Sequence, residues 1–95
     1  MRSDKRWTQI FKIFSNINRV RIVALLMKEK KMTVTEISEK LEISFKSASQ
    51  HLILLEHLDV LESRGKEGHV FYSINQQMPR DIRAAIKLFY DSRES

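Results

Sequence analysis

Polar side chains recur on one side of a helical pattern between residues 46 and 57. At about 100° per residue, Lys46, Gln50 and His57 point to one side, together with Ile53, opposite an apolar stripe. In a DNA major groove, a side-chain amide reads adenine, and a lysine meets guanine or a phosphate. The alternative is an ordinary solvated helix face. The chemistry on offer is duplex DNA recognition, provided that neighbouring elements present this face to a groove.

Metal and covalent chemistry have few candidate residues. The chain has no cysteine, which excludes disulfides, thiolate metal sites, cysteine nucleophiles and thiol redox sensing. The spacing of His51, His57 and His69 brings no two of them to one metal from one helix face. The sequence also lacks a nucleophile elbow, a phosphate-binding glycine loop and an HExxH motif. We therefore expect no enzyme activity, no cofactor and no metal site.

The elements that would hold the polar face have the pattern of a helix-turn-helix. Thr33 and Glu36 fit a capping box, which predicts a helix of about two turns from that point. Ser44 offers a second cap, and residues 45–59 have the apolar spacing of a longer helix. Only about three residues separate the two helices, as in a helix-turn-helix connection. Residues 45–59 are therefore the predicted recognition helix.

A change of hydrophobic period after Asp59 predicts a β-hairpin. Val70, Tyr72 and Ile74 alternate with their neighbours, and β-branched and aromatic residues dominate the run. Residues 60–64 can pair with it through the segment 65–68, whose two glycines permit the positive φ angles of hairpin turns. Residues 60–74 would then form a wing beside the recognition helix.

Amphipathic helices are expected at both ends of the chain, at about 4–15 and 79–92, the second opening at Pro79. Their apolar faces consist of Trp7, Ile10, Phe11 and Phe14, and of Ile82, Ala85, Ile86 and Phe89. These faces either close a monomeric core or meet a second copy of the chain. Because both ends carry such large apolar faces, we favour a homodimer.

These elements add up to one domain over residues 1–95. A further helix from Asn18 to about Lys30, apolar on most sides, would be central and buried. The predicted fold is mostly α with a small β-hairpin, a winged helix-turn-helix with the order helix, helix, helix, helix, strand, strand, helix. The longest apolar run, Ile22 to Met27, is too short for a signal sequence or a membrane span, so we expect a cytoplasmic protein without membrane contact.

Charge is unevenly distributed along the chain. The net charge is +5 overall, but residues 1–31 carry nine basic and two acidic side chains, whereas residues 32–61 carry two basic and five acidic ones. Attraction to phosphates would come from the N-terminal part and from the wing, while the lysines of residues 28–31 are better read as a solubilising turn. The acidic character of residues 32–61, which contain the predicted helix-turn-helix, favours an alternative function. In this alternative the winged helix binds another protein and has no specific affinity for DNA.

The stretch from Phe14 to Ile74 resembles the ArsR/SmtB family of winged-helix transcriptional repressors. The resemblance is concentrated in Arg19-Val20-Arg21-Ile22, Val34-Thr35-Glu36-Ile37, Ser49-Gln50-His51-Leu52 and Val70-Phe71-Tyr72. It covers about two thirds of the chain. It implies a homodimer that occupies a pseudo-palindromic operator in double-stranded DNA and leaves it when an effector binds.

The resemblance also implies roles for individual residues. The positions that match DNA contacts of the family are Lys46, Ser47, Ser49, Gln50 and His51 in the recognition helix and Arg64, Lys66 and His69 in the wing. The direction of His51 on the helix is close to the apolar side, so two interpretations stay open. It is either a half-buried histidine bonded to backbone or a residue that contacts DNA or relays a signal.

Several residues depart from the family pattern. Glu42 and Asp59 stand where glycine is common, Phe45 replaces a polar residue, and Ile53 stands where arginine is common. Family sensors of soft metals use cysteines in the segment matching residues 32–38, and none is present here. A second family site uses aspartate and histidines, whereas this chain has Asp81, Arg83 and Glu94 in that helix. We therefore expect a regulator that does not respond to metal, with an unknown effector.

Overall fold

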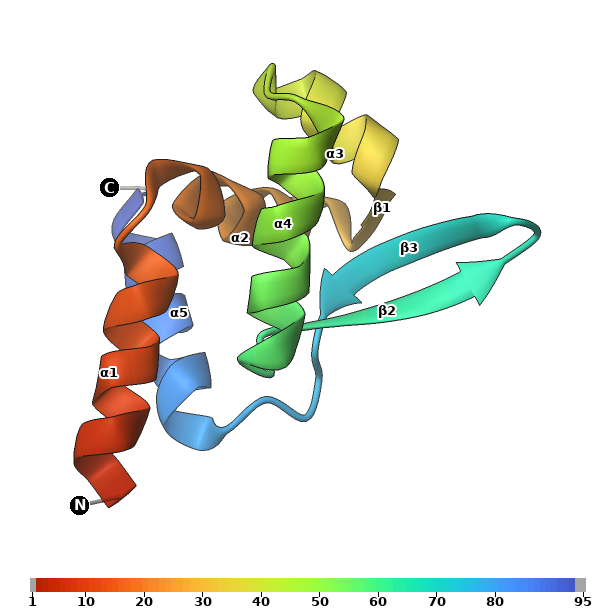
Figure 1. The fold of residues 1–95 in the computed structure, drawn as a ribbon. Helices are drawn as coiled ribbons and strands as arrows, with labels where there is room; N and C mark the ends of the chain where they lie inside the picture. The colour runs from red at the N-terminus through yellow and green to blue at the C-terminus, as the bar shows by residue number, and fades with distance from the viewer. Residues whose placement is uncertain (1, 94–95) are drawn as a thin grey trace.

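The computed structural model describes residues 2–93, with side chains described from Asp4 onward. Its elements are α1 (Arg2–Phe14), α2 (Ile17–Glu29), β1 (Lys31–Thr33), α3 (Val34–Leu41), α4 (Phe45–His57), β2 (Leu61–Lys66), β3 (His69–Ile74) and α5 (Arg80–Arg93). In Figure 1, α1 and α5 lie side by side on one flank, α4 stands in the middle, and the β2–β3 hairpin projects from the other flank. The winged helix-turn-helix prediction is confirmed.

Side-chain caps set where the central helices begin. The Thr33 hydroxyl accepts from the Glu36 N–H at 3.2 Å, and the Glu36 carboxylate accepts from the Thr33 N–H at 2.8 Å, which completes the predicted capping box. The Ser44 hydroxyl caps α4 by accepting from the Ser47 N–H at 3.0 Å. The side-chain oxygen of Asn16 caps α2 by accepting from the Asn18 N–H at 2.9 Å, and α2 therefore begins at Ile17 and not at the predicted Asn18.

Both helices of the helix-turn-helix end at an acidic residue in a left-handed conformation. Glu42 has a φ of 56° and Asp59 a φ of 64°, at the two positions where the family often carries glycine. In each case the next residue donates its N–H back into the last turn, from Ile43 to the Ser38 carbonyl and from Val60 to the Leu55 carbonyl, both at 3.0 Å. These turns direct the chain from α3 into α4 and from α4 into the wing.

The wing has a tighter turn than the sequence indicated. Strands β2 and β3 pair antiparallel from Leu61 opposite Ile74 to Lys66 opposite His69, which leaves only Glu67 and Gly68 in the turn. Both turn residues have positive φ, 52° and 81°, a combination whose twist matches that of a hairpin. The predicted four-residue connection over 65–68 is therefore wrong, because Gly65 lies within β2 opposite Val70.

A short third strand, absent from the predicted order, anchors the wing. Strand β1 pairs antiparallel with β3, with Lys31 opposite Ser73 and Thr33 opposite Phe71, so the sheet order is β1-β3-β2. Three residues are too few to show a period of two, so the sequence carries no sign of this strand. Since Thr33 also caps α3, the pairing fixes the base of the wing to the start of the helix-turn-helix.

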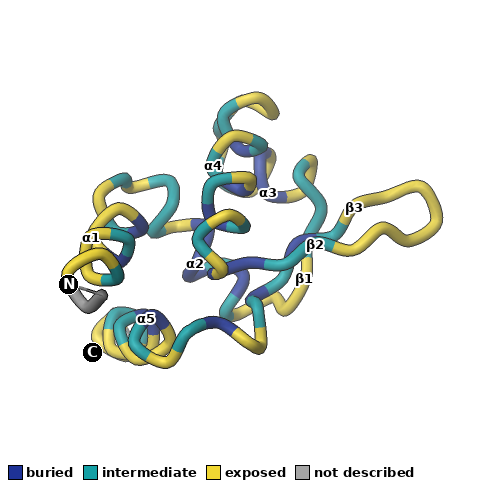
Figure 2. The backbone as a smooth tube through the Cα atoms, turned by 60° about the horizontal axis from the view of Figure 1, so that its bottom comes forward, coloured by how far each residue is buried: buried dark blue, intermediate teal, exposed yellow. Residues whose placement is uncertain are grey.

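The core lies where α2 and α4 meet the sheet and the end helices. Ile22 and Val23 of α2 and Leu52 and Leu55 of α4 have no exposed surface. Figure 2 shows this buried centre, with exposed residues along the wing tip and on the outer sides of the helices. One side of α4 is thus held by the core, and the other side faces outward.

Candidate nucleic-acid interface

The outward side of α4 carries the residues that the sequence assigned to groove reading. Lys46, Gln50 and His57 are exposed, and Ser47 and Ser49 are half-buried at the margins of the face. Two apolar side chains share it, Phe45 with 59% and Ile53 with 46% of their surface exposed. Because the opposite side of α4 is buried, the helix has little freedom to rotate, and this mixed polar and apolar face has a fixed direction.

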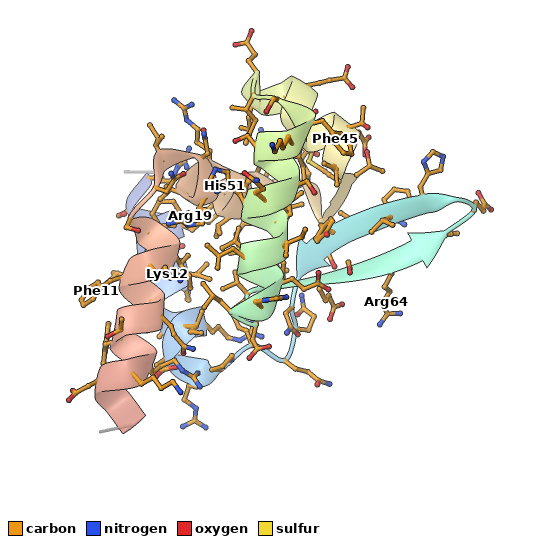
Figure 3. All side chains as sticks on the ribbon, viewed as in Figure 1. Phe11, Lys12, Arg19, Phe45, His51 and Arg64 are labelled. Atoms are coloured by element: carbon orange, nitrogen blue, oxygen red, sulfur yellow. The ribbon has the colours of Figure 1, made fainter. Side chains whose placement is uncertain are left out.

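His51 lies at the edge of this face and contacts Arg19 of α2. Its Nδ1 is 3.5 Å from Nη1 of Arg19. Figure 3 labels both residues, which lie next to each other between α2 and α4. Burial, and then the positive charge of Arg19, lower the pKa of His51. The half-buried position agrees with one of the two interpretations of this residue, but its partner is a guanidinium and not the backbone. The residue therefore links α4 to α2, a role that sequence reasoning missed because the two residues are far apart in the chain.

The wing presents its basic residues at alternate positions of two strands. Arg64 and Lys66 are exposed on β2, and His69 is exposed on β3 directly opposite Lys66. The hairpin extends well beyond the core in Figure 1, and the Arg64 side chain points away from the sheet in Figure 3. Glu62 and Glu67 of the same hairpin balance the formal charges of Arg64 and Lys66, so the hairpin as a whole is not basic. Its two exposed cations are the groups that suit the flanking backbone or minor groove of a duplex.

The base of the wing meets the start of α3 around a hollow of about 400 Å³ lined by Thr33, Thr35, Glu36, His69 and Phe71. Hydrogen bonds from Thr33, its backbone N–H first, lower the pKa of Glu36, with a smaller contribution from His69. Lys31 stands beside it, with Nζ 5.0 Å from the centre of the Phe71 ring. The sequence predicts that this lysine belongs to a solubilising turn, but it lies in β1 and adds positive charge at the base of the wing.

The residues assigned to a dimer interface divide into two groups. Ile10, Ile82 and Ile86 retain 2% or less of their surface and belong to the core of this chain. The others are exposed or half-buried and line a groove of about 500 Å³ between α1 and α5, whose complete lining is Trp7, Ile10, Phe11, Phe14, Asp81, Ala84, Ala85, Leu88, Phe89 and Ser92.

Two contacts join α1 and α5 along this groove. The rings of Phe14 and Phe89 are 5.3 Å apart, and an Arg6–Asp81 ion pair of 3.2 Å joins the helices near the other end. Phe11 and Leu88 stand on opposite rims with 66% and 74% of their surface exposed. The apolar spacing in the sequence predicts that Phe11, Phe14 and Phe89 lie on this surface. It does not include Leu88, which lies outside the i, i+3, i+4, i+7 positions of the last helix.

The donor groups of the chain do not fit a metal of the family type. No three acidic or histidine side chains gather closely enough to hold an ion anywhere in residues 4–93. Asp81 is paired with Arg6 and also accepts from the Ile82 N–H at 2.9 Å, and Arg83 donates to the Gln76 carbonyl. Glu94, the remaining residue considered, lies outside the described residues.

Over residues 2–93, every helix is too short or too polar to cross a bilayer.

Comparison with known proteins agrees with this geometry. A family model described as bacterial regulatory protein, arsR family, matches residues 16–65, from the cap of α2 into β2. The arsenic resistance transcriptional regulator ArsR1 of Pseudomonas putida is 28% identical over 85 residues, which are 90% of this chain and 66% of that protein. The transcriptional repressor SdpR of Bacillus subtilis is 35% identical over 72 residues, 76% of this chain and 79% of that protein.

The fold is also that of a solved relative. HlyU from Vibrio cholerae superposes with a TM-score of 0.82 at 25% sequence identity, covering 98% of this chain and 97% of that one. In sequence comparison the same protein bears the name transcriptional activator. Proteins similar to this chain thus include some that are named repressors and one that is named an activator.

Proposed function

This chain belongs to the arsR family of bacterial transcriptional regulators, and from this premise we propose that it represses transcription as a homodimer bound to a pseudo-palindromic operator. It is a winged-helix regulator of the DNA-binding type and not an enzyme. In the proposal, α4 enters the major groove, and the wing contacts the flanking backbone or the minor groove. The protein would act in the cytoplasm, where bacterial DNA lies.

The observation that carries the proposal is the fixed outward face of α4 beside a projecting hairpin that exposes Arg64 and Lys66. Gln50 is the residue best suited to read a base, because its amide can bond adenine through two atoms at once. Lys46, one turn earlier, can reach guanine or a phosphate, with Ser47 and Ser49 at the sides. The exposed Phe45 ring offers contact with a thymine methyl group, so part of the readout would be apolar.

Attraction to the duplex must overcome the acidic residues of α3. Glu39 of α3 and Glu42 at the C-cap of that helix are exposed, and both precede the recognition helix. Arg64 and Lys66 of the wing are matched in number by Glu62 and Glu67 of the same hairpin. The excess of positive charge therefore comes from residues 1–31, which include Lys31 at the base of the wing. Counterion release at these few contacts predicts operator binding that weakens as salt rises.

The homodimer in this proposal is formed by the α1–α5 groove. One protein with this fold, a possible ArsR-family regulator from Mycobacterium bovis, is described as a homodimeric winged helix-turn-helix DNA-binding domain. The exposed side chains of Trp7, Phe11 and Leu88 give a second copy an apolar surface to cover, worth roughly 25 cal/mol for each Å² before the cost of association. A two-fold axis through this groove would present two α4 helices to half-sites spaced by about one helical turn of roughly 34 Å.

The test is selection of bound duplexes from a random pool, followed by gel shifts on the selected site and on scrambled DNA at rising salt. We expect an inverted-repeat sequence, with at least about a thousandfold preference over scrambled DNA at moderate salt. A protein-binding module would instead show no duplex binding even at low salt, which would contradict the proposal. Transcription from a promoter carrying the site then distinguishes repression, which we expect, from activation.

A further inference from the structure

A second hollow, separate from the α4 face and from the α1–α5 groove, opens between α2, α3 and α5. It has a volume of about 400 Å³, and its charged lining consists of Arg21, Lys28, Lys40 and Arg93. No acidic residue belongs to the lining. In the part of the chain that the structure describes, none of these four cations lies within 4.0 Å of a carboxylate.

The floor of the hollow is apolar. Ala24 is buried, Leu25 and Leu41 are half-buried, and the half-buried Tyr90 adds an aromatic ring with a hydroxyl group. Four like charges around such a floor raise the local positive potential, and a bound anion would relieve their repulsion. A ligand that also has an apolar body would cover the floor, and the volume falls within the usual range for small-molecule sites.

We propose that this hollow binds a small organic carboxylate with an apolar or aromatic body, and that this ligand is an effector of the regulator. The effector role rests on the proposed function, whereas the binding site does not. The carboxylate would lie among the cations, and the body would lie against Leu25, Leu41 and Tyr90.

The position of the hollow supplies the link to DNA binding. Lys40 and Leu41 form the last turn of α3, and Glu42 then leads into the recognition helix. Tyr90 and Arg93 lie near the end of α5, whose other side forms the α1–α5 groove. A ligand that contacts both α3 and α5 would influence how the helix-turn-helix is oriented relative to α1 and α5. Such a ligand changes operator affinity only if it binds one of these orientations better than the other.

Binding is tested with benzoate on the isotope-labelled full chain, with amide chemical shifts as the readout. Benzyl alcohol serves as the uncharged match, and inorganic phosphate as the anion without an apolar body, all at constant ionic strength. We expect benzoate to saturate amides of α2, the end of α3 and the end of α5 with a Kd of about 1 mM or below, and each comparison ligand to bind at least about tenfold more weakly. Absence of such shifts at roughly 20 mM benzoate, or equal shifts with phosphate, would overturn the site.

Variants place the ligand in the hollow. Arg21 and Lys40 are both exposed, so Arg21→Gln and Lys40→Gln should leave the fold intact, and each should weaken benzoate binding by about tenfold. Lys5→Gln removes the same charge from the exposed side of α1 and should change binding by less than about twofold. Equal effects of all three variants would show a general charge effect and contradict the site.

The effector role has its own readout. Saturating benzoate should change operator affinity by at least about fivefold in the wild type, and Lys40→Gln should need about tenfold more benzoate to reach the same change. Benzoate binding without any change in operator affinity would overturn the effector role alone. If the two glutamine variants weakened operator binding without ligand, the hollow would be a phosphate contact and the proposal would be wrong. Failure to find any operator would contradict the proposed function and leave the benzoate result standing.

Discussion

Arg19 and His51 join the first helices to the recognition helix, with Nη1 of Arg19 3.5 Å from Nδ1 of His51. The guanidinium is held in place by the Lys12 carbonyl, which accepts from Nη2 at 2.7 Å and from Nε at 3.1 Å, and by the Ser15 hydroxyl at 3.1 Å. Figure 3 shows Lys12, Arg19 and His51 in succession from α1 to α4. Since Arg19 can only donate, Nδ1 must be the unprotonated nitrogen of a neutral ring for this contact to be a hydrogen bond.

The first prediction is a pH dependence of stability that originates at His51. Its pKa is lowered in the fold, so the unfolded chain takes up a proton more readily than the folded one. The free energy of unfolding keeps its full value while the pH stays above the pKa of an unfolded histidine, about 6.5. It decreases as the pH falls from there to the lower pKa of His51 in the fold, because the unfolded chain alone takes up the proton. Urea unfolding of the wild type and of His51→Gln between pH 8 and pH 5 should show a steeper loss for the wild type. Parallel curves would contradict the prediction.

The second prediction separates base reading from phosphate contact on α4. Gln50→Ala should cost roughly 1–3 kcal/mol on the selected operator and little on random DNA. Lys46→Ala, if the lysine meets a phosphate, should weaken both and lower the salt slope of binding by about one. Both side chains are exposed and opposite the buried stripe, so neither change should affect folding. Equal losses for both variants on both DNAs would show that the assignment is wrong.

The third prediction tests the α1–α5 groove as the dimer interface. Phe11→Asp places a charge on the rim of the groove and should shift the sedimenting species at micromolar concentration from dimer to monomer. Ile17→Asp is the matched control, because Ile17 is equally apolar and 63% exposed but lies at the start of α2, outside the groove. A monomeric wild type, or dissociation caused equally by both variants, would refute this interface.

The fourth prediction concerns the two left-handed acidic residues. Glu42→Gly and Asp59→Gly should each stabilise the fold by up to about 1 kcal/mol, because glycine adopts this backbone conformation without the steric cost of a side chain. The gain should be smaller for Asp59, since aspartate tolerates the conformation better than glutamate does. Glu39→Gly, inside α3, should instead destabilise by about 1 kcal/mol. Thermal unfolding of the three variants measures both the expected gains and the expected loss in stability. A loss of stability in Glu42→Gly would contradict the proposed backbone strain at Glu42.

Local patterns in the sequence predicted most of this fold, and contacts between distant residues account for what they missed. The capping box at Thr33 and the buried stripe of α4 depend on neighbours within a few residues, so spacing reveals them. Strand β1 exists only because β3, some forty residues later, offers it a partner. The Arg19–His51 contact likewise spans 32 residues. The same limit applies to the exposed hollows, since no periodicity indicates that Arg21, Lys40 and Arg93 converge.

The last prediction is that operator binding does not respond to metal. Relatives include a regulator named for arsenic resistance, yet this chain has no cysteine, and its Asp81 is paired with Arg6 where the family would use it as a ligand. A metal shifts an equilibrium only by its difference in affinity for two states, and a chain without a suitable donor set offers little affinity in either.

One equivalent of Zn²⁺, Ni²⁺, Co²⁺ or Cd²⁺ should therefore leave the Kd for the selected operator unchanged within about twofold. The measurement is a fluorescence anisotropy titration of labelled operator, with a chelator-treated sample as reference. Arg6→Leu is a useful companion variant, because it releases Asp81 from its ion pair without adding a metal donor, and the response to metal should stay absent. A shift of more than about tenfold, or 1.4 kcal/mol, with any of these ions on the wild type would refute the metal-independent reading.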